Sequence, residues 1–162
     1  MYNIDHLLAL WEEIHARIPQ ANLWLLGQPS QRVRDRCAGR DDILSFGRIP
    51  KQQVLDYVTN FDVALYPRTE DQGVRASKIA EYMGAGVPTV SYDFRVTEDL
   101  REHGAGVLVR TPSEFVAAVE RLSSDRAQLL ALAESARSAG RKLDWDKLAE
   151  RYKREILDEY LT

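Results

Sequence analysis

The sequence predicts an α/β domain built on a doubly wound parallel sheet, in which helices cover both faces. Short apolar runs alternate with segments of helical period, and the runs begin roughly 20 residues apart, which is typical of repeated strand–helix units. Most of the runs are continuously apolar instead of alternating, as expected for strands that are buried on both faces. A length of 162 residues corresponds to about one domain with a substantial core.

Five apolar runs are predicted to form the strands of this sheet. Gly27 and Gly47 follow two of the runs directly, and Pro67 ends a third, so each of these strands leads into a turn. The predicted strands cover residues 22–26, 43–46, 61–66, 87–92 and 106–109.

Helical segments lie between and before these strands. Apolar residues at helical spacing predict a helix over residues 4–18, which Pro19 ends. Pro50 suits the first position of a helix that carries Val54 and Val58. Residues 76–83 predict a further helix, with the glycines of 84–86 as its C-cap.

The last third of the chain is predicted to be helical. A stripe that includes Phe115 and Leu122 forms one helix, Leu129 and Leu132 belong to a second, and 145–160 forms a third. We expect residues 1–162 to form a single domain, with 112–162 as a helical tail packed on it.

Composition excludes several classes of protein. A net charge of −3 and a pI near 5.7 do not suggest nucleic acid as a partner. Cys37 is the single cysteine, and no Cys/His spacing suggests a metal site. The longest apolar runs are about five residues, against the roughly 20 that a membrane span needs. Polar residues at Asn3, Asp5 and His6 interrupt any signal peptide, so we expect a cytoplasmic location, with peripheral membrane association as the alternative in a full-length context.

The loops that follow the strands are the candidate binding positions, because ligands of open α/β sheets lie beyond the carboxyl ends of the strands. The loop over 67–75 is the longest and most polar, and Gly73 lies shortly before a helix. A glycine there lets backbone N–H groups approach a phosphate at the helix N-terminus. An ordinary surface loop is the alternative.

Glu81 follows Gly73 by eight residues and lies in an otherwise small or apolar part of the helix. A carboxylate there can accept two hydrogen bonds from a ribose diol while phosphates stay at the helix start. From the residues alone, an exposed glutamate paired with Lys78 or Arg75 is the favoured interpretation.

The remaining reactive residue types do not form a catalytic pattern. His6, His15 and His103 have no mutual spacing of interest, and each is interpreted as a surface or capping residue. Arg36 and Arg40 could lower the thiol pKa of Cys37, but a packed helix cysteine is the better interpretation. Phosphate-loop, GxGxxG and Gly-x-Ser-x-Gly signatures do not occur.

Segment 73–93 (GVRASKIAEYMGAGVPTVSYD) resembles the donor-binding region of GT-B glycosyltransferases of retaining family 4. The shared hallmark is an acidic residue in a helix, followed by a small-Gly-x-Pro turn into a strand. Segments 18–27, 43–50, 62–67 and 103–109 are similar to further strands of that family in the same order, and Asp144-Trp145 is similar to its closing helix. The resemblance covers essentially the whole chain.

This resemblance implies the half of a glycosyltransferase that binds a nucleoside-diphosphate sugar, without a metal or other cofactor. It implies that Glu81 holds the ribose hydroxyls and that backbone groups of Gly73, Val74 and Arg75 meet the phosphate and sugar. Arg48 and Ile49 would contact the base. The catalytic residues stay unassigned.

The chain also departs from the family pattern. Gly73 stands where many members carry a first glutamate, and the family's first strand and its N-terminal acceptor-binding domain have no counterpart in the sequence. That first strand would lie between the strands at 22–26 and 61–66. Either these two pair directly, or a strand from another copy or a partner chain fills the position; we expect the second, which would make the chain an oligomer.

Three functions remain open at this point. The first is the donor-binding part of a glycosyltransferase, with negligible turnover when isolated because donor and acceptor must be oriented together. The second is a non-enzymatic nucleotide-binding module, or a subunit that a partner completes. A sugar-nucleotide epimerase is the third, and the Glu81 segment and Asp144-Trp145 favour family 4 over it.

Overall fold

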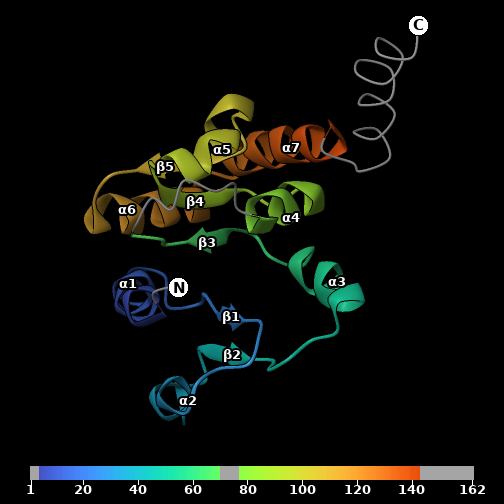
Figure 1. Ribbon diagram of the computed structural model, residues 1–162. Coiled ribbons are helices and arrows are strands. Elements are labelled where there is room, and N and C mark those ends of the chain that lie inside the picture. Colours follow the sequence, from blue (N-terminus) through green and yellow to red (C-terminus); the bar gives the residue numbers. More distant parts are fainter. Residues whose placement is uncertain (1–3, 70–76, 143–162) are drawn as a thin grey trace, which may run out of the picture.

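The structure, a computed structural model, describes residues 4–69 and 77–142. Parallel strands alternate with helices along these residues (Figure 1), which confirms the predicted α/β class. The elements are α1 (Ile4–Arg17), β1 (Leu23–Leu25), α2 (Gln31–Cys37), β2 (Ile43–Ser45), the 3₁₀ turn η1 (Lys51–Gln53), α3 (Val54–Val58), β3 (Ala64–Tyr66), α4 (Ser77–Ala85), β4 (Thr89–Tyr92), the 3₁₀ turn η2 (Arg95–Thr97), α5 (Glu98–His103), β5 (Gly106–Val109), α6 (Pro112–Ser124) and α7 (Arg126–Lys142).

The strands form two parallel groups. β1 pairs with β2, with Leu23 opposite Ile43, while β4 lies between β3 and β5, with Val90 opposite both Leu65 and Val107. In the part of the chain that the structure describes, β1 and β3 do not pair with each other, and each has one strand neighbour only. Direct pairing of these two strands, one of the two predicted arrangements, is therefore not observed.

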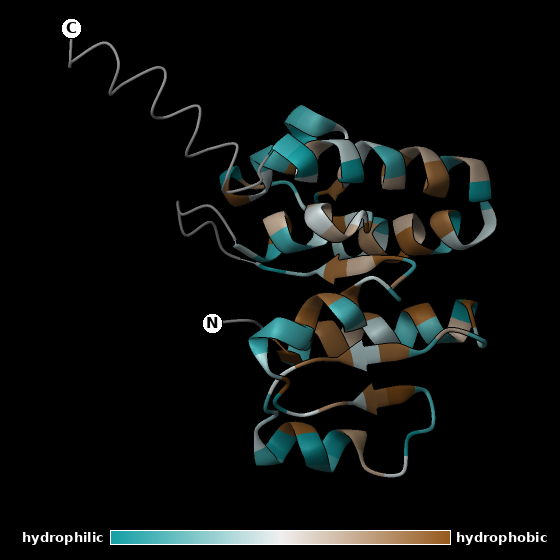
Figure 2. Ribbon diagram, turned by 90° about the vertical axis from the view of Figure 1, so that its right-hand side faces the viewer, coloured by the Kyte–Doolittle hydropathy of each residue, from teal (hydrophilic) through white to brown (hydrophobic). Residues whose placement is uncertain are grey.

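The core lies on both faces of the strands, as continuous apolar runs predict. On one face α1 and α6 pack against β1, β4 and β5, and Ile14 and Phe115 are fully buried there. On the other face α4, α5 and α7 enclose Tyr66, Ile79 and Leu100. Figure 2 shows hydrophobic colouring concentrated on the strands, between the helical layers.

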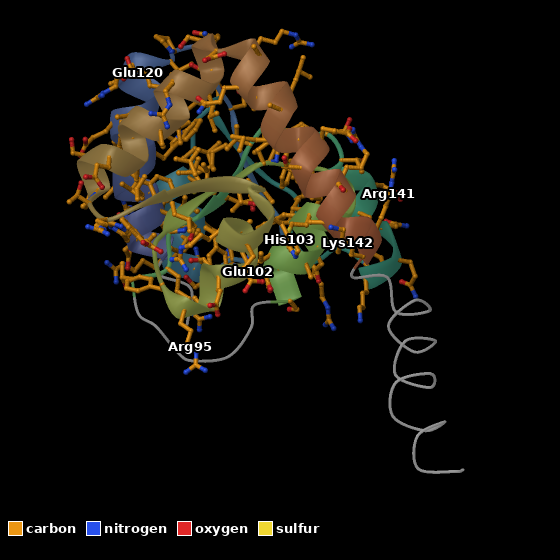
Figure 3. All side chains as sticks on the ribbon, turned by 90° about the horizontal axis from the view of Figure 1, so that it is seen from above. Arg95, Glu102, His103, Glu120, Arg141 and Lys142 are labelled. Atoms are coloured by element: carbon orange, nitrogen blue, oxygen red, sulfur yellow. The ribbon has the colours of Figure 1, made fainter. Side chains whose placement is uncertain are left out.

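α4 and α7 approach very closely. A Cβ atom built on Gly140 of α7 would lie 2.6 Å from the Cα of Gly84 and 2.6 Å from the backbone oxygen of Met83. Ala136 and Ala139 of α7 are buried on the same side. Small residues on α7 therefore let the two helix backbones touch. Figure 3 shows α7 crossing the molecule, with Lys142 near its end beside His103 of α5.

Element boundaries differ from the prediction in a few places. The strands are shorter than predicted: residues 22, 26, 46, 61–63 and 87–88 lie outside them. Pro50 caps η1 instead of opening one continuous helix. α5 was not predicted. α6 is confirmed and begins with a capping box between Thr111 and Glu114. The predicted third helix of the tail, 145–160, lies outside the described residues.

A charged cluster joins α1 to the start of β2. Asp42 accepts hydrogen bonds from Trp11 Nε1 at 2.7 Å and from Arg40 Nη2 at 2.6 Å on Oδ2, and from Arg40 Nε at 2.8 Å on Oδ1. These donors hold the pKa of Asp42 well below its usual range, with the guanidinium as the largest cause. Asp42 is only 13% exposed, so solvent screens the pair weakly.

We expect Asp42→Asn to lower the stability of the fold by about 1.5–3 kcal/mol at neutral pH, because hydrogen bonds to a charged group are lost. That corresponds to a Tm lower by roughly 3–12 °C for a chain of this size. Because the folded pKa is depressed, this stabilisation is present above the unfolded pKa near 4 and is lost as pH falls below it. The Tm difference between parent and variant should therefore shrink in calorimetry from pH 6 to pH 3.

Glu134→Gln serves as the control, since the ion pair of Glu134 with Arg137 is exposed and worth little. A difference between Asp42→Asn and the parent that stays constant down to pH 3 would contradict the assigned charge interaction.

Candidate functional site

The loops after the strands lie at the carboxyl edge of each sheet. Gly27, which follows β1, donates its backbone N–H to the carbonyl of Gly47, after β2, at 2.8 Å. Both glycines have positive φ, so the two loops turn sharply and stay joined. Residues 67–69 follow β3, and η2 follows β4. Candidate loops therefore follow the carboxyl ends of β1, β2, β3 and β4.

Buried hydroxyl groups fix the end of β4. Ser91 Oγ donates to the carbonyl of Tyr66 at 3.0 Å, which ties β4 to the end of β3. Thr97 Oγ1 contacts the carbonyl of Tyr92 at 3.0 Å and receives the N–H of Phe94 at 3.2 Å. Both hydroxyl side chains belong to buried residues. These hydrogen bonds tie the carboxyl end of β4 to β3 and to the turn that leads into η2.

Glu81 lies one turn inside α4, about 6 Å along the axis from Ser77 at 1.5 Å per residue. Its side chain is 33% exposed, and Oε2 lies 3.0 Å from Lys78 Nζ. This ion pair with Lys78 is one of the two pairings that the residues alone favoured over ribose binding, which only the family resemblance implied. Lys78 is 39% exposed, so both members of the ion pair are partly open to solvent.

Arg48 and Ile49 lie in the loop after β2, directly beyond the turn at Gly47. Arg48 is exposed and Ile49 is half-buried. Arg48 and Ile49 follow β2 of the two-stranded sheet, whereas Glu81 lies in α4, which follows β3 of the three-stranded sheet. The candidate base-binding residues and Glu81 are therefore on opposite sides of the unpaired edges of β1 and β3. Gly73, Val74 and Arg75 lie outside the described residues.

Arg68 was not singled out from the sequence. It follows β3 by two residues, and its Nη1 donates a hydrogen bond to Tyr66 Oη at 3.2 Å. A half-buried guanidinium at the carboxyl end of β3 adds positive charge to the edge that carries α4. The sequence could have indicated Arg68 as a candidate ligand-binding residue, since it is the first cation of the longest candidate loop.

The other reactive residues have structural contacts. His6 Nε2 lies 2.7 Å from Tyr92 Oη, and burial raises the pKa of that tyrosine. His103 ends α5 ahead of Gly104, in agreement with a capping position. Burial raises the pKa of the Cys37 thiol despite the opposing charges of Arg40 and Arg36. The packed-cysteine interpretation is therefore the one that fits.

No three or more metal-ligating side chains of His, Cys, Asp or Glu gather in residues 4–69 and 77–142. Across those same ranges no helix has the length and apolar character that crossing a membrane requires.

Comparison with solved structures shows the same fold in larger proteins. The pneumococcal O-GlcNAc transferase GtfA, solved with UDP and GlcNAc, matches with a TM-score of 0.78 and 18% identity, over 97% of this chain and 33% of that one. WaaG, a glycosyltransferase of lipopolysaccharide biosynthesis, matches with a TM-score of 0.75 and 14% identity, over 93% and 42%. Anabaena HepE in complex with UDP matches with a TM-score of 0.72 and 16% identity, over 91% and 44%.

The chain thus spans a third to under a half of these proteins. No curated protein sequence matched it. A family model described as glycosyl transferases group 1 matches residues 1–125, which is most of the chain and includes every candidate donor residue. With the parallel GT-B half in the structure, this match shows that the chain belongs to the glycosyl transferases group 1 family.

Proposed function

We propose that the chain is the nucleotide-sugar-binding half of a retaining, family 4 type glycosyltransferase. It would bind a nucleoside-diphosphate sugar, whose sugar passes to an acceptor held by another domain or a partner chain. The observation that carries the proposal is Glu81, a half-buried carboxylate one turn inside the helix that follows the longest loop of the carboxyl edge. Ligand-bound relatives of the same fold support it, since GtfA and HepE were solved with UDP.

Each candidate residue has a role in this proposal. Glu81 accepts hydrogen bonds from the ribose hydroxyls, and these bonds are strong because the acceptor is charged. Backbone N–H groups at Gly73, Val74 and Arg75 meet the phosphate and sugar ahead of α4. Arg48 and Ile49 contact the base from the loop after β2. No metal or cofactor is part of the proposal.

The chain alone is expected to bind the donor but to turn it over negligibly. Transfer requires donor and acceptor to be oriented together, and most of the rate advantage comes from that orientation. The solved relatives are two to three times longer than the part that this chain matches. A non-enzymatic nucleotide-binding module, or a subunit completed by a partner, is the alternative, and the unpaired edges of β1 and β3 favour the completed subunit.

We expect Glu81→Ala to weaken UDP and GDP binding by about ten- to a hundred-fold in titration calorimetry, because hydrogen bonds to a charged group contribute about 1.5–3 kcal/mol. Lys78→Ala is the matched control. It removes the partner of Glu81 on the same helix face but keeps the carboxylate, so affinity should change little.

A second ligand separates the ribose contact from a general loss of structure. The parent should bind 2′-deoxy-UDP more weakly than UDP, whereas Glu81→Ala should bind the two equally, as a double-mutant cycle requires for a direct contact. If the parent and Glu81→Ala discriminate equally between the two ligands, the ribose contact is refuted.

A further inference from the structure

The two-stranded sheet has one covered face and one open face. Leu23 and Ile43 are buried on the covered face, in the apolar cluster that includes α1 and α6. Because successive side chains of a strand point to opposite faces, Trp24 and Leu44 lie on the open face, where the strand register places them side by side. Figure 1 shows α1 and α2 on one side of β1 and β2, whereas α3 lies on the other side, further toward α4. Leu44 is consequently 41% exposed.

Aromatic rings extend the open face from β1 to α3. The ring centroids of Trp24 and Phe46 are 4.8 Å apart, and those of Phe46 and Tyr57, a residue of α3, are 5.1 Å apart. Phe46 is 36% exposed, while Trp24 and Tyr57 are half-buried. The open face therefore consists of Trp24, Leu44, Phe46 and Tyr57. Aromatic side chains are enriched in the buried centres of protein–protein interfaces, so this composition is typical of a surface that another protein covers.

Opposite charges lie at the two ends of the open face. Asp41 directly precedes the residues that lead into β2, and Arg48 follows β2 beyond the turn at Gly47; both side chains are exposed. Neither side chain has a hydrogen-bond or ion-pair partner within residues 4–69 and 77–142. Lys51 and Asp56, also exposed, add one charge of each sign from the segment of η1 and α3. Along β2 the surface thus changes from acidic through apolar to basic.

This polarity makes the open face complementary to itself in one orientation. When two copies of the face are opposed with their β2 strands antiparallel, the Asp41 end of each copy lies over the Arg48 end of the other. With the two β2 strands parallel, like charges would be opposed, and like-charge contacts suppress association. Sheets that pack face to face keep their strand directions closely aligned, which the antiparallel arrangement allows. The charges therefore favour a second copy of the chain, in antiparallel orientation, as the occupant.

We propose that the open face is a homodimer interface, on which a second copy packs face to face about a two-fold axis perpendicular to β2. Leu44 and Phe46 of both copies form its centre, and the contact between Asp41 and Arg48 forms twice at its rim. Such an isologous contact uses the same patch on both copies and closes on itself, so it yields a dimer and no longer assembly. The inference is independent of the proposed donor contact of Glu81, which lies in α4.

Light scattering on the full 162-residue chain across the micromolar concentration range tests the interface. The parent should show a dimer mass that falls toward the monomer mass on dilution. Leu44→Glu opposes two carboxylates near the axis in apolar surroundings and should weaken the dimer by about a hundredfold or more. Leu130→Glu is the matched control, because Leu130 is 54% exposed on α7 and receives the same charge, yet lies outside the open face. Its dimer should be as strong as that of the parent.

Asp41→Lys tests the orientation and leaves Arg48, a candidate base contact, unchanged. It brings two cations together at each end of the interface and should weaken the dimer by about tenfold, most strongly at low salt. Should Leu44→Glu fail to fold, Leu44→Ser takes its place, with an expected loss of about tenfold. A parent that stays monomeric throughout the range would overturn the proposal. A dimer that the Leu44 variant leaves as strong as Leu130→Glu does would also overturn it, because the copies would then associate through another surface. An unchanged dimer in Asp41→Lys would overturn the antiparallel arrangement.

Discussion

Replacing Gly140 with valine is expected to lower the Tm by roughly 6–12 °C. The Cβ of any side chain at this position would lie 2.6 Å from the Cα of Gly84 and 2.8 Å from its nitrogen, atoms of a helix backbone that cannot rotate away. Overpacking of this kind costs about 3 kcal/mol when the neighbour cannot yield, and each kcal/mol moves Tm by about 2–4 °C in a chain of this length. Since α4 carries Glu81, UDP affinity should fall as well.

Gly84→Ala is the matched control from the facing helix. A Cβ on Gly84 meets nothing within 4 Å, and its φ is negative, so alanine fits without strain. Removing a helix glycine reduces the entropy of the unfolded chain and should raise stability by about 0.4–1 kcal/mol. Thermal scans of the two variants should therefore shift in opposite directions. Equal shifts, or a Gly140→Val protein as stable as the parent, would show that α7 does not pack on α4 as described.

The strands were predictable because their residues form short, continuously apolar runs, although only β4 is buried along its whole length and two of the three residues of β2 are exposed. In β4 all four residues are buried, as a continuously apolar run between two helical layers predicts. Polar ends were less predictable. Asn22 and Asp62 lie within or beside the apolar runs, yet they fall outside β1 and β3, because a polar residue at a strand end is solvated instead of paired.

The elements that sequence reasoning missed depend on tertiary contacts. α5 has six residues and a single buried side chain, Leu100, which is too short for a helical period to emerge. Its Gly104 cap and its acidic first turn were the available signals. Gly140 reads in the sequence as an unfavourable helix residue, and only the approach of α4 explains it.

At the candidate site, sequence reasoning placed Glu81 on a helix beyond the longest loop, and the structure has it there. The sequence could not decide between ribose binding and an ion pair with Lys78, because both use the same carboxylate. The two-part sheet was predicted only as one of two outcomes. Whether β1 and β3 pair depends on where α1 packs. α1 shares one buried apolar cluster with β1, β4 and α6.

Gly106→Ala is expected to be among the most destabilising single substitutions in the chain. Gly106 opens β5 opposite Thr89 of β4, and a Cβ on it would lie 2.2 Å from the backbone oxygen of Thr89. Thr89 is fully buried, so the strand that carries this oxygen is held from both faces. We expect a loss of about 3 kcal/mol or more and a Tm lower by roughly 6–12 °C.

Gly104→Asn separates this steric effect from the conformational freedom of glycine. Gly104 has φ +58° at the end of α5, a left-handed conformation that asparagine tolerates, and a Cβ there meets nothing within 4 Å. Its Tm should stay within about 2 °C of the parent, since a surface substitution without a clash changes stability by about 0.5 kcal/mol or less. Chemical denaturation should give the same ranking, with an unchanged slope for Gly104→Asn and a lower midpoint for Gly106→Ala. If Gly106→Ala instead unfolds at the parent's midpoint, β5 does not lie against Thr89, and the register of the three-stranded sheet must be revised.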